Sequence, residues 1–169
     1  KMCVSIVNQM FMDNWRPDYI VGITRGGNVP ATIISNMTGI RCEALKVSLR
    51  DDKQGHGSES NCWMAEDAYG YYTPETSGEF APGGHSTDKQ KNILIVDDIN
   101  DTGATFNWII QDWESSCMPH HLEVWEKVWG GNVRFATLTE NLASEFDKVN
   151  YTCHEVNKAE EDVWLVYPW

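Results

Sequence analysis

Residues 92–105 read NILIVDDINDTGAT, the stretch of the chain that is most informative about its architecture. Its first part, Asn92–Val96, is an aliphatic run of the kind found in strands buried on both faces of a parallel sheet. The run ends abruptly at two carboxylates, Asp97 and Asp98, and Thr102–Trp113 then has the apolar spacing of a helix. A strand, a polar loop and a helix in this order predict one unit of an α/β domain.

A second unit of the same kind lies upstream. Tyr19–Ile23 predicts another buried strand, a pair of glycines follows it, and a helix is expected from about Asn28 to Gly39. Further helices are predicted over Val4–Asp13 and after Pro119, and further strands over Glu43–Leu49, Val133–Leu138 and, at a sheet edge, Val163–Tyr167. Residues 1–169 are therefore expected to form one α/β domain with a mainly parallel central sheet flanked by helices.

Composition narrows the classes of partner. The chain has 13 Lys and Arg against 25 Asp and Glu, a net charge of −12, which argues against nucleic acid and anionic membranes as partners. No apolar run approaches the ~20 residues of a membrane span, and no signal-peptide pattern is found, so a cytoplasmic protein is expected. The five cysteines form no C-x-x-C pair, which signals neither a disulfide framework nor a zinc site.

The chemistry is expected where the strands end, because open parallel sheets bind ligands beyond the carboxyl ends of their strands. The loop over 24–28 joins a cation to two glycines at a helix start, a pattern suited to an anion. The loop over 97–105 joins carboxylates, which suit sugar hydroxyls or a hydrated divalent ion, to hydroxyls and free amides, which suit a phosphate. Together they predict a ligand with phosphate at both ends and hydroxyls between. Ordinary turns rich in Asp, Gly and Thr remain the alternative.

Asn92–Thr105 closely resembles the phosphoribosyl-pyrophosphate signature of type I phosphoribosyltransferases. Pro17–Ala31, with VGITRGGNVPA, resembles their pyrophosphate loop, and residues 164–169, WLVYPW, are similar to the tail of the xanthine-guanine branch. The resemblance implies the type I phosphoribosyltransferase fold, with a small C-terminal hood over 139–169 and a long mobile catalytic loop within 51–90. It also implies Mg²⁺ as cofactor, phosphoribosyl pyrophosphate and a purine base as substrates, and a homodimer or homotetramer.

The resemblance assigns roles to individual residues. Asp97 and Asp98 would hold the ribose hydroxyls and orient the Mg²⁺-bound donor. The 5-phosphate would be cradled by the backbone and hydroxyls of Thr102, Gly103, Ala104 and Thr105, and the pyrophosphate by Thr24, Arg25, Gly26 and Gly27. Arg25 would act in catalysis, and the family often has a cis peptide bond before that position. Lys46 and Arg50 are further cations expected near the polyanion.

The resemblance also bears on the acceptor base. Asp101 stands where 6-oxopurine enzymes carry the acidic group that handles the proton at purine N7; its alternative role is to cap the following helix. Trp164 would stack on the ring, with Leu165 offering backbone contacts, although a core position is an alternative for Trp164. Asn141 stands where a lysine commonly binds the 6-oxo group, and an amide can donate there without charge. A 6-oxopurine is the favoured substrate.

Other interpretations stay open at this point. The chain could bind the donor without catalysis, as a ligand sensor, or could accept a different base. A synthetase of the donor would need a longer chain with an ATP site, and no G-x-x-x-x-G-K-[ST] motif is found.

Overall fold

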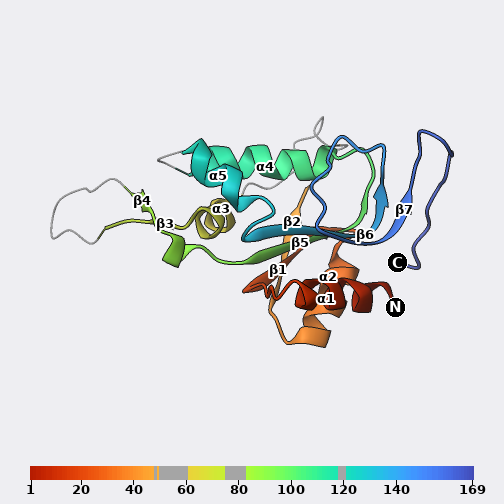
Figure 1. Cartoon of the computed structure of the whole chain (residues 1–169), viewed down its shortest axis with the longest axis horizontal. Helices are drawn as coiled ribbons and strands as arrows, with labels where there is room; N and C mark the ends of the chain where they lie inside the picture. The colour runs from red at the N-terminus through yellow and green to blue at the C-terminus, as the bar shows by residue number, and fades with distance from the viewer. Residues whose placement is uncertain (48, 50–60, 75–82, 118–120) are drawn as a thin grey trace.

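The computed structural model describes residues 1–47, 49, 61–74, 83–117 and 121–169. Its centre is a five-stranded sheet in the order β2-β1-β5-β6-β7 (Figure 1). The strands are β1 (Tyr19–Thr24), β2 (Cys42–Lys46), β5 (Ile93–Asn100), β6 (Val133–Asn141) and β7 (Tyr151–Val156). Each neighbouring pair runs parallel, which confirms the predicted α/β fold with a parallel sheet.

Two layers of helices cover the sheet, α1 and α2 on one face and α3, α4 and α5 on the other (Figure 1). Their bounds are α1 (Met2–Met12), α2 (Asn28–Thr38), α3 (Cys62–Tyr69), α4 (Ala104–Ser116) and α5 (Leu122–Val128). Strand β5 shows why both faces are covered. Ile93 and Ile95 join the cluster under α3–α5, whereas Leu94 and Val96 join the cluster over α1 and α2. Side chains alternate along a strand, so a continuous aliphatic run supplies both cores at once.

Helix α3 corrects the prediction of a long flexible loop over 51–90. Met64, Ala65, Ala68 and Tyr69 on this helix are buried in the core under α4 and α5. The hydroxyl of Tyr19 donates a 2.8 Å hydrogen bond to Asp67 Oδ2, which ties the helix to β1. The helix is followed by a short antiparallel pair, β3 (Tyr71–Tyr72) and β4 (Gly84–His85), and a turn of 3-10 helix, η2 (Thr87–Lys89). The remaining parts of the expected loop, 51–60 and 75–82, lie outside the described residues.

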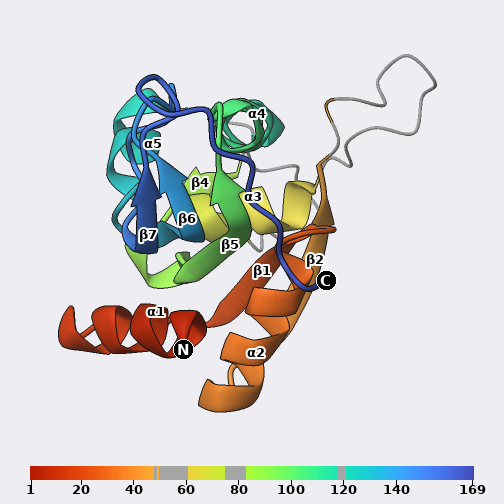
Figure 2. The same ribbon diagram turned by 90° about the vertical axis from the view of Figure 1, so that its right-hand side faces the viewer.

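The C-terminal segment also differs from expectation. The edge strand predicted over 163–167 is not formed, and β7 takes the sheet edge instead by pairing with β6 from Ala136↔Tyr151 onward. The ring of Tyr151 is buried, whereas Trp164 and Val166 of the 163–167 segment are exposed. After β7 the chain turns at 158–160 and crosses the carboxyl end of the sheet toward β1 and β2 (Figure 2). Among the described helices, none is long and apolar enough to cross a membrane.

Candidate functional site

The two glycine-containing loops lie next to each other because β1 and β5 are neighbouring parallel strands. The contact between the loops depends on the glycines. A Cβ atom on Gly26 would lie 2.4 Å from Asp98 Oδ2, and one on Gly27 would lie 2.2 Å from the carbonyl oxygen of Val96. No larger residue fits either position without a shift. The structure thus brings the Arg25–Gly27 segment directly against the acidic end of β5.

The first loop is shaped by its own short-range contacts. The peptide bond between Thr24 and Arg25 is cis, as the resemblance led us to expect. Asn28 Nδ2 donates to Thr24 Oγ1 at 3.2 Å, and α2 begins at Asn28. The Arg25 side chain is exposed beside this helix start. An exposed guanidinium and the N-terminal end of an 11-residue helix both favour an anion at this place.

The second loop lines a cavity of about 450 Å³ at the end of β5. The cavity wall is formed by the continuous stretch Asp97–Phe106, together with Val47 and Leu49 from the chain after β2. Every residue predicted to bind the donor between Asp97 and Thr105 is in this wall. Val47 and Leu49 were not predicted, because an apolar residue after a strand carries no functional signal in the sequence.

Asp97 and Asp98 give the wall of this cavity two neighbouring carboxylates. The backbone amide of Asp98 donates to Asp97 Oδ1 at 2.8 Å, and that of Ile99 donates to Asp98 Oδ1 at 2.8 Å. Burial and, next, the negative charge of Asp98 raise the pKa of Asp97 well above its ordinary value. Such a pair is stabilised by hydroxyl donors or by a cation. Both carboxylates therefore suit ribose hydroxyls and a hydrated Mg²⁺ ion.

The donor set also fits the way in which Mg²⁺ usually binds. In the described part of the chain, no group of three or more His, Cys, Asp or Glu side chains surrounds a potential metal position. Mg²⁺ keeps several waters and is commonly held by one or two carboxylates plus substrate phosphates. Asp97 and Asp98 are sufficient for that kind of binding.

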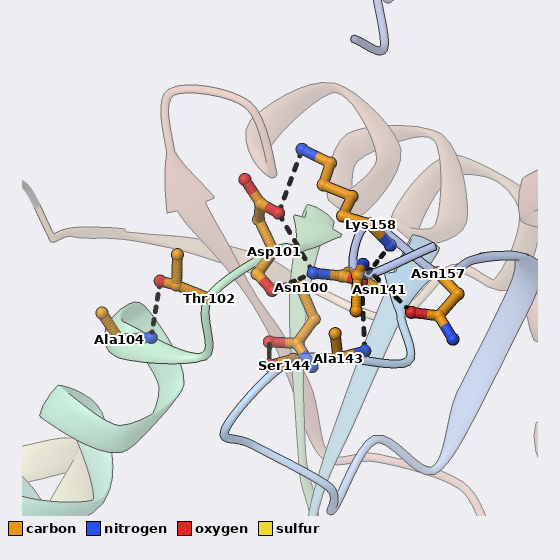
Figure 3. Close-up of polar contacts among 10 residues, drawn as sticks. Asn100, Asp101, Thr102, Ala104, Asn141, Ala143, Ser144, Asn157 and Lys158 are labelled. Carbon is orange, nitrogen blue, oxygen red and sulfur yellow. Dashed lines mark hydrogen bonds and ion pairs between the residues drawn. The ribbon is translucent and has the colours of Figure 1, made fainter. Parts of the chain in front are cut away.

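The start of α4 forms a second anion site. Gly103 has a φ of +88°, and a Cβ atom there would lie 2.5 Å from the backbone nitrogen of Phe146, so only glycine fits. Thr102 and Ala104 are exposed, and the amide of Ala104 makes a long 3.3 Å contact to Thr102 Oγ1 (Figure 3). The free amides at the start of this 13-residue helix, with two threonine hydroxyls, suit a phosphate group.

The segment after β6 holds this loop in shape. Asn100, which is buried, donates from Nδ2 to the carbonyl oxygen of Phe146 at 2.9 Å and accepts from Ser144 Oγ at 3.0 Å. The amide of Glu145 donates to the carbonyl oxygen of Thr102 at 3.0 Å. Asn100 was not predicted as part of the site, although its place between Asp98 and Asp101 was a signal for it. It acts as a positioning residue for the donor loop.

Asp101 lies at the centre of a polar network that joins three segments (Figure 3). Asn141 Nδ2 donates to the carbonyl oxygen of Asp101 at 2.9 Å and approaches its Oδ1 atom at 3.4 Å. Lys158 Nζ lies 3.0 Å from Asp101 Oδ1. The Oδ1 atom of Asn141 accepts from the amides of Ala143 at 3.1 Å and Lys158 at 3.0 Å. The side-chain amide of Asn141, which was predicted to contact the base, is thus hydrogen-bonded to other protein groups.

Lys158 is the main residue that sequence reasoning missed. Its only sequence signal is that it is the single Lys or Arg between residues 151 and 169, in a segment with four acidic residues. The chain reversal after β7 brings it back to Asp101, a contact across 57 residues that spacing alone does not reveal.

The tail reaches the site through a residue other than the predicted ones. Trp164 is 83% exposed, and neither it nor Leu165 lines the cavity, so the structure does not bring them to it. Tyr167 instead donates to the carbonyl oxygen of Asp98 at 3.2 Å and shares a 2.5 Å hydrogen bond with Thr139 Oγ1. Its ring stacks on Trp169 with 5.1 Å between centroids.

Comparisons with known proteins agree with this geometry. A family model described as a phosphoribosyl transferase domain matches residues 2–167. The chain is 23% identical over 193 aligned positions to xanthine phosphoribosyltransferase 1 of Saccharomyces cerevisiae, covering all of this chain and 84% of that protein. Among solved structures, it resembles a purine phosphoribosyltransferase from Pyrococcus horikoshii, with a TM-score of 0.57, 20% identity, and 99% and 86% of the two chains covered.

A second solved structure is similar to nearly the same degree. It is the xanthine-guanine-hypoxanthine phosphoribosyltransferase of Helicobacter pylori, with a TM-score of 0.56, 15% identity, and 96% and 88% of the two chains covered. At these identities the structural likeness establishes the fold, and the match to the family model covers almost the whole chain.

Proposed function

Because the chain belongs to the phosphoribosyltransferase family and is therefore a transferase, we propose that its acceptor is a 6-oxopurine. The base is hypoxanthine, guanine or xanthine, and the products are the nucleoside 5-monophosphate and pyrophosphate. The observation that carries the proposal is the placement of Asp101 in the wall of the donor cavity, with a cation 3.0 Å from its carboxylate. The activity would serve purine salvage in the cytoplasm.

The donor is expected to lie across the two loops. Asp97 and Asp98 accept hydrogen bonds from the ribose hydroxyls, and the amides from Thr102 to Thr105 bind the 5-phosphate. The segment Arg25–Gly27 then receives the pyrophosphate. Bound Mg²⁺ would supply charge neutralisation of the pyrophosphate, held on the protein side by Asp97 and Asp98.

Catalysis would consist of placing the ribose and stabilising the departing pyrophosphate. The overall field of a protein with a net charge of −12 repels this polyanion, so local cations are needed. Arg25 is exposed at the loop, and Lys46 is the register partner of Thr24 on the neighbouring strand. Arg50, the third cation expected here, lies outside the described residues.

Asp101 is the residue that favours a purine as the acceptor. A carboxylate at the cavity wall can accept the ring N–H of a purine and take its proton as positive charge develops on the ring. The names of the yeast and Helicobacter pylori relatives, which contain xanthine, guanine and hypoxanthine, support the same choice of base.

The family resemblance further leads us to expect a homodimer or homotetramer, which light scattering would measure.

The experiment is pyrophosphate release from phosphoribosyl pyrophosphate and Mg²⁺, with hypoxanthine, guanine, xanthine, adenine, orotate and uracil tested separately. We expect release with one or more of the oxopurines, and a loss of ~10²–10⁴-fold in kcat for Asp101→Ala, the range of general base catalysis. Asp147→Ala removes an exposed carboxylate of the same region and serves as the control.

Two outcomes would contradict the proposal. Turnover with adenine, orotate or uracil alone would identify a transferase for another base. Donor binding without release for every base would identify a ligand sensor.

A further inference from the structure

Lys158 is a cation that contacts Asp101, a residue of the cavity wall, and that the donor chemistry does not use. It lies in the turn after β7, its side chain is 23% exposed, and its ammonium is 3.0 Å from Asp101 Oδ1. We propose that Lys158 reads the acceptor base, by donating a hydrogen bond to a carbonyl oxygen adjacent to the ring N–H that Asp101 accepts. This inference rests on the proposed function and names the residue that sets its specificity.

Lys158 and Asp101 together offer both kinds of hydrogen-bonding group. An ammonium group has three N–H donors and no acceptor, and an ionised carboxylate has acceptors only. One donor of Lys158 is directed at Asp101 Oδ1, and the carboxylate, whose side chain is 43% exposed, keeps a second oxygen. The pair therefore presents a donor beside an acceptor to whatever enters the cavity next to Asp101.

The complement of that pattern is a heterocycle with an acceptor beside a donor. A ring N–H flanked by a carbonyl oxygen has this arrangement, with the N–H on the carboxylate and the oxygen on the ammonium. A ring with an amino group in place of the carbonyl would direct N–H atoms at the ammonium and leave it without an acceptor. Sites built from hydrogen-bonding groups reject such analogues strongly, because their own groups lose their partners.

The position of Lys158 is fixed by the backbone, which distinguishes it from an ordinary surface lysine. Its amide donates to Asn141 Oδ1 at 3.0 Å, and Asn141 is buried, 6% exposed, at the end of β6. The same side chain holds the carbonyl oxygen of Asp101 at 2.9 Å through Nδ2. One amide group thus sets the distance between the segment that carries the cation and the loop that carries the carboxylate (Figure 3).

The test compares Lys158→Gln, Lys158→Arg and the wild-type protein. Lys148→Gln, at an exposed lysine of the segment before β7, is the matched control. For each variant we would measure kcat and KM for the oxopurine, the Kd of the Mg²⁺-bound donor by calorimetry, and the melting temperature. Inhibition by the corresponding 6-aminopurine is measured alongside.

We expect Lys158→Gln to raise the KM for the oxopurine about tenfold or more, the scale of one hydrogen bond to a charged group. The donor Kd and the melting temperature of Lys158→Gln stay near the wild-type values. The ratio between binding of the oxopurine and binding of the 6-aminopurine decreases. In Lys158→Arg the KM for the oxopurine lies between the wild-type and Lys158→Gln values. The control variant behaves as wild type.

The outcomes separate this inference from the function on which it rests. Wild-type turnover of an oxopurine with a KM in Lys158→Gln within twofold of wild type overturns the inference alone. A variant that loses donor affinity and melting temperature together also overturns it, because Lys158 then has a structural role only. A wild-type protein without oxopurine turnover overturns the proposed function, and this inference with it.

Discussion

Gly26 and Gly27 are adjacent, yet a methyl group would have different consequences at each. At Gly27 the added Cβ meets the backbone carbonyl of Val96 at 2.2 Å and backbone atoms of Ile23 at 2.7 and 2.9 Å. These atoms belong to β1 and β5, which cannot separate without loss of the sheet. At Gly26 the added atom meets the Asp98 carboxylate at 2.4 Å, and the end of a side chain can rotate away.

We therefore expect Gly27→Ala to lower the free energy of unfolding by ~1–3 kcal/mol, the usual cost of overpacking. Gly26→Ala should unfold close to the wild-type midpoint but bind the donor at least tenfold more weakly, because Asp98 is displaced. Urea unfolding and calorimetric titration with Mg²⁺-bound donor measure the two effects. Equal losses of stability in the two variants would show that the Asp98 contact is as rigid as the backbone one.

At this scale the sequence predicted the residues that are contiguous in the chain. Asp97–Thr105 form one wall of one cavity, because the end of a strand and the start of a helix are local structures. Lys158 and Tyr167 could not be found in this way, since their contacts to Asp101 and to Asp98 depend on how 157–169 folds back. Asn141 was found, but its bonds to Asp101 and Lys158 required the same information.

At the scale of elements, the outer strand pair carries an electrostatic cost. Glu140 of β6 and Glu155 of β7 are register partners. Burial and, next, the negative charge of Glu155 raise the pKa of Glu140 above its ordinary value of 4.5. A raised pKa in the folded state means that this group favours folding below pH 4.5, and that the contribution is lost as the pH rises through the higher folded value.

We expect Glu155→Gln to stabilise the protein at pH 7 by a few tenths of a kcal/mol, roughly 0.5 at most, because Glu155 is exposed and water and salt screen the repulsion. The gain should fade as the pH falls through the raised pKa of Glu140, because a neutral Glu140 no longer repels Glu155. Thermal unfolding between pH 4 and 8 measures it, with Glu160→Gln as the exposed control. A gain that is constant with pH would assign the effect to something other than charge.

Helix α3 is an element that the sequence pattern alone does not predict. Its buried residues, Met64, Ala65, Ala68 and Tyr69, have helical spacing, but the helix is only eight residues long. Segments rich in glycine and polar residues flank it on both sides, and such composition predicts loops. Tertiary packing against the core under α4 and α5 makes so short a helix stable. The long aliphatic runs of β1 and β5 needed no such context.

For the whole molecule, the tail after β7 connects the last segment of the chain to the centre of the site. The Tyr167 hydroxyl is bonded to Thr139 and to the backbone of Asp98, and burial raises its pKa. Tyr167→Phe keeps the ring and removes both hydrogen bonds. This change should lower the free energy of unfolding by about 1 kcal/mol. We expect a several-fold lower kcat/KM for the base and faster proteolysis of the tail.

Limited proteolysis followed by mass spectrometry, together with steady-state kinetics, measures both effects of Tyr167→Phe. Tyr72→Phe, at a partly exposed tyrosine in β3, is the control. Kinetics equal to wild type with a tail that is cleaved faster would show that the tail does not shape the site.

The general architecture was predictable because the alternation of strand, loop and helix is repeated along the chain. The strand order and the layers follow from short parallel crossovers once β1 and β5 pair. The choice of edge strand was predicted wrongly, because 163–167, VWLVY, is an apolar run like those of the other strands. In the structure Tyr151 of the 151–156 segment is buried in the core, whereas Tyr167 is only partly buried against it.

The network around Asp101 also constrains how such a chain can change by descent. A lysine introduced at position 141 would place a second ammonium against the carboxylate that Lys158 already occupies, and would release the amide of Lys158 from its acceptor. Loss of Lys158 first would remove the cation that the described residues place on Asp101. If Lys158 reads the base as proposed, either single change weakens the site, so the cation is expected to move between positions 141 and 158 only through an impaired intermediate.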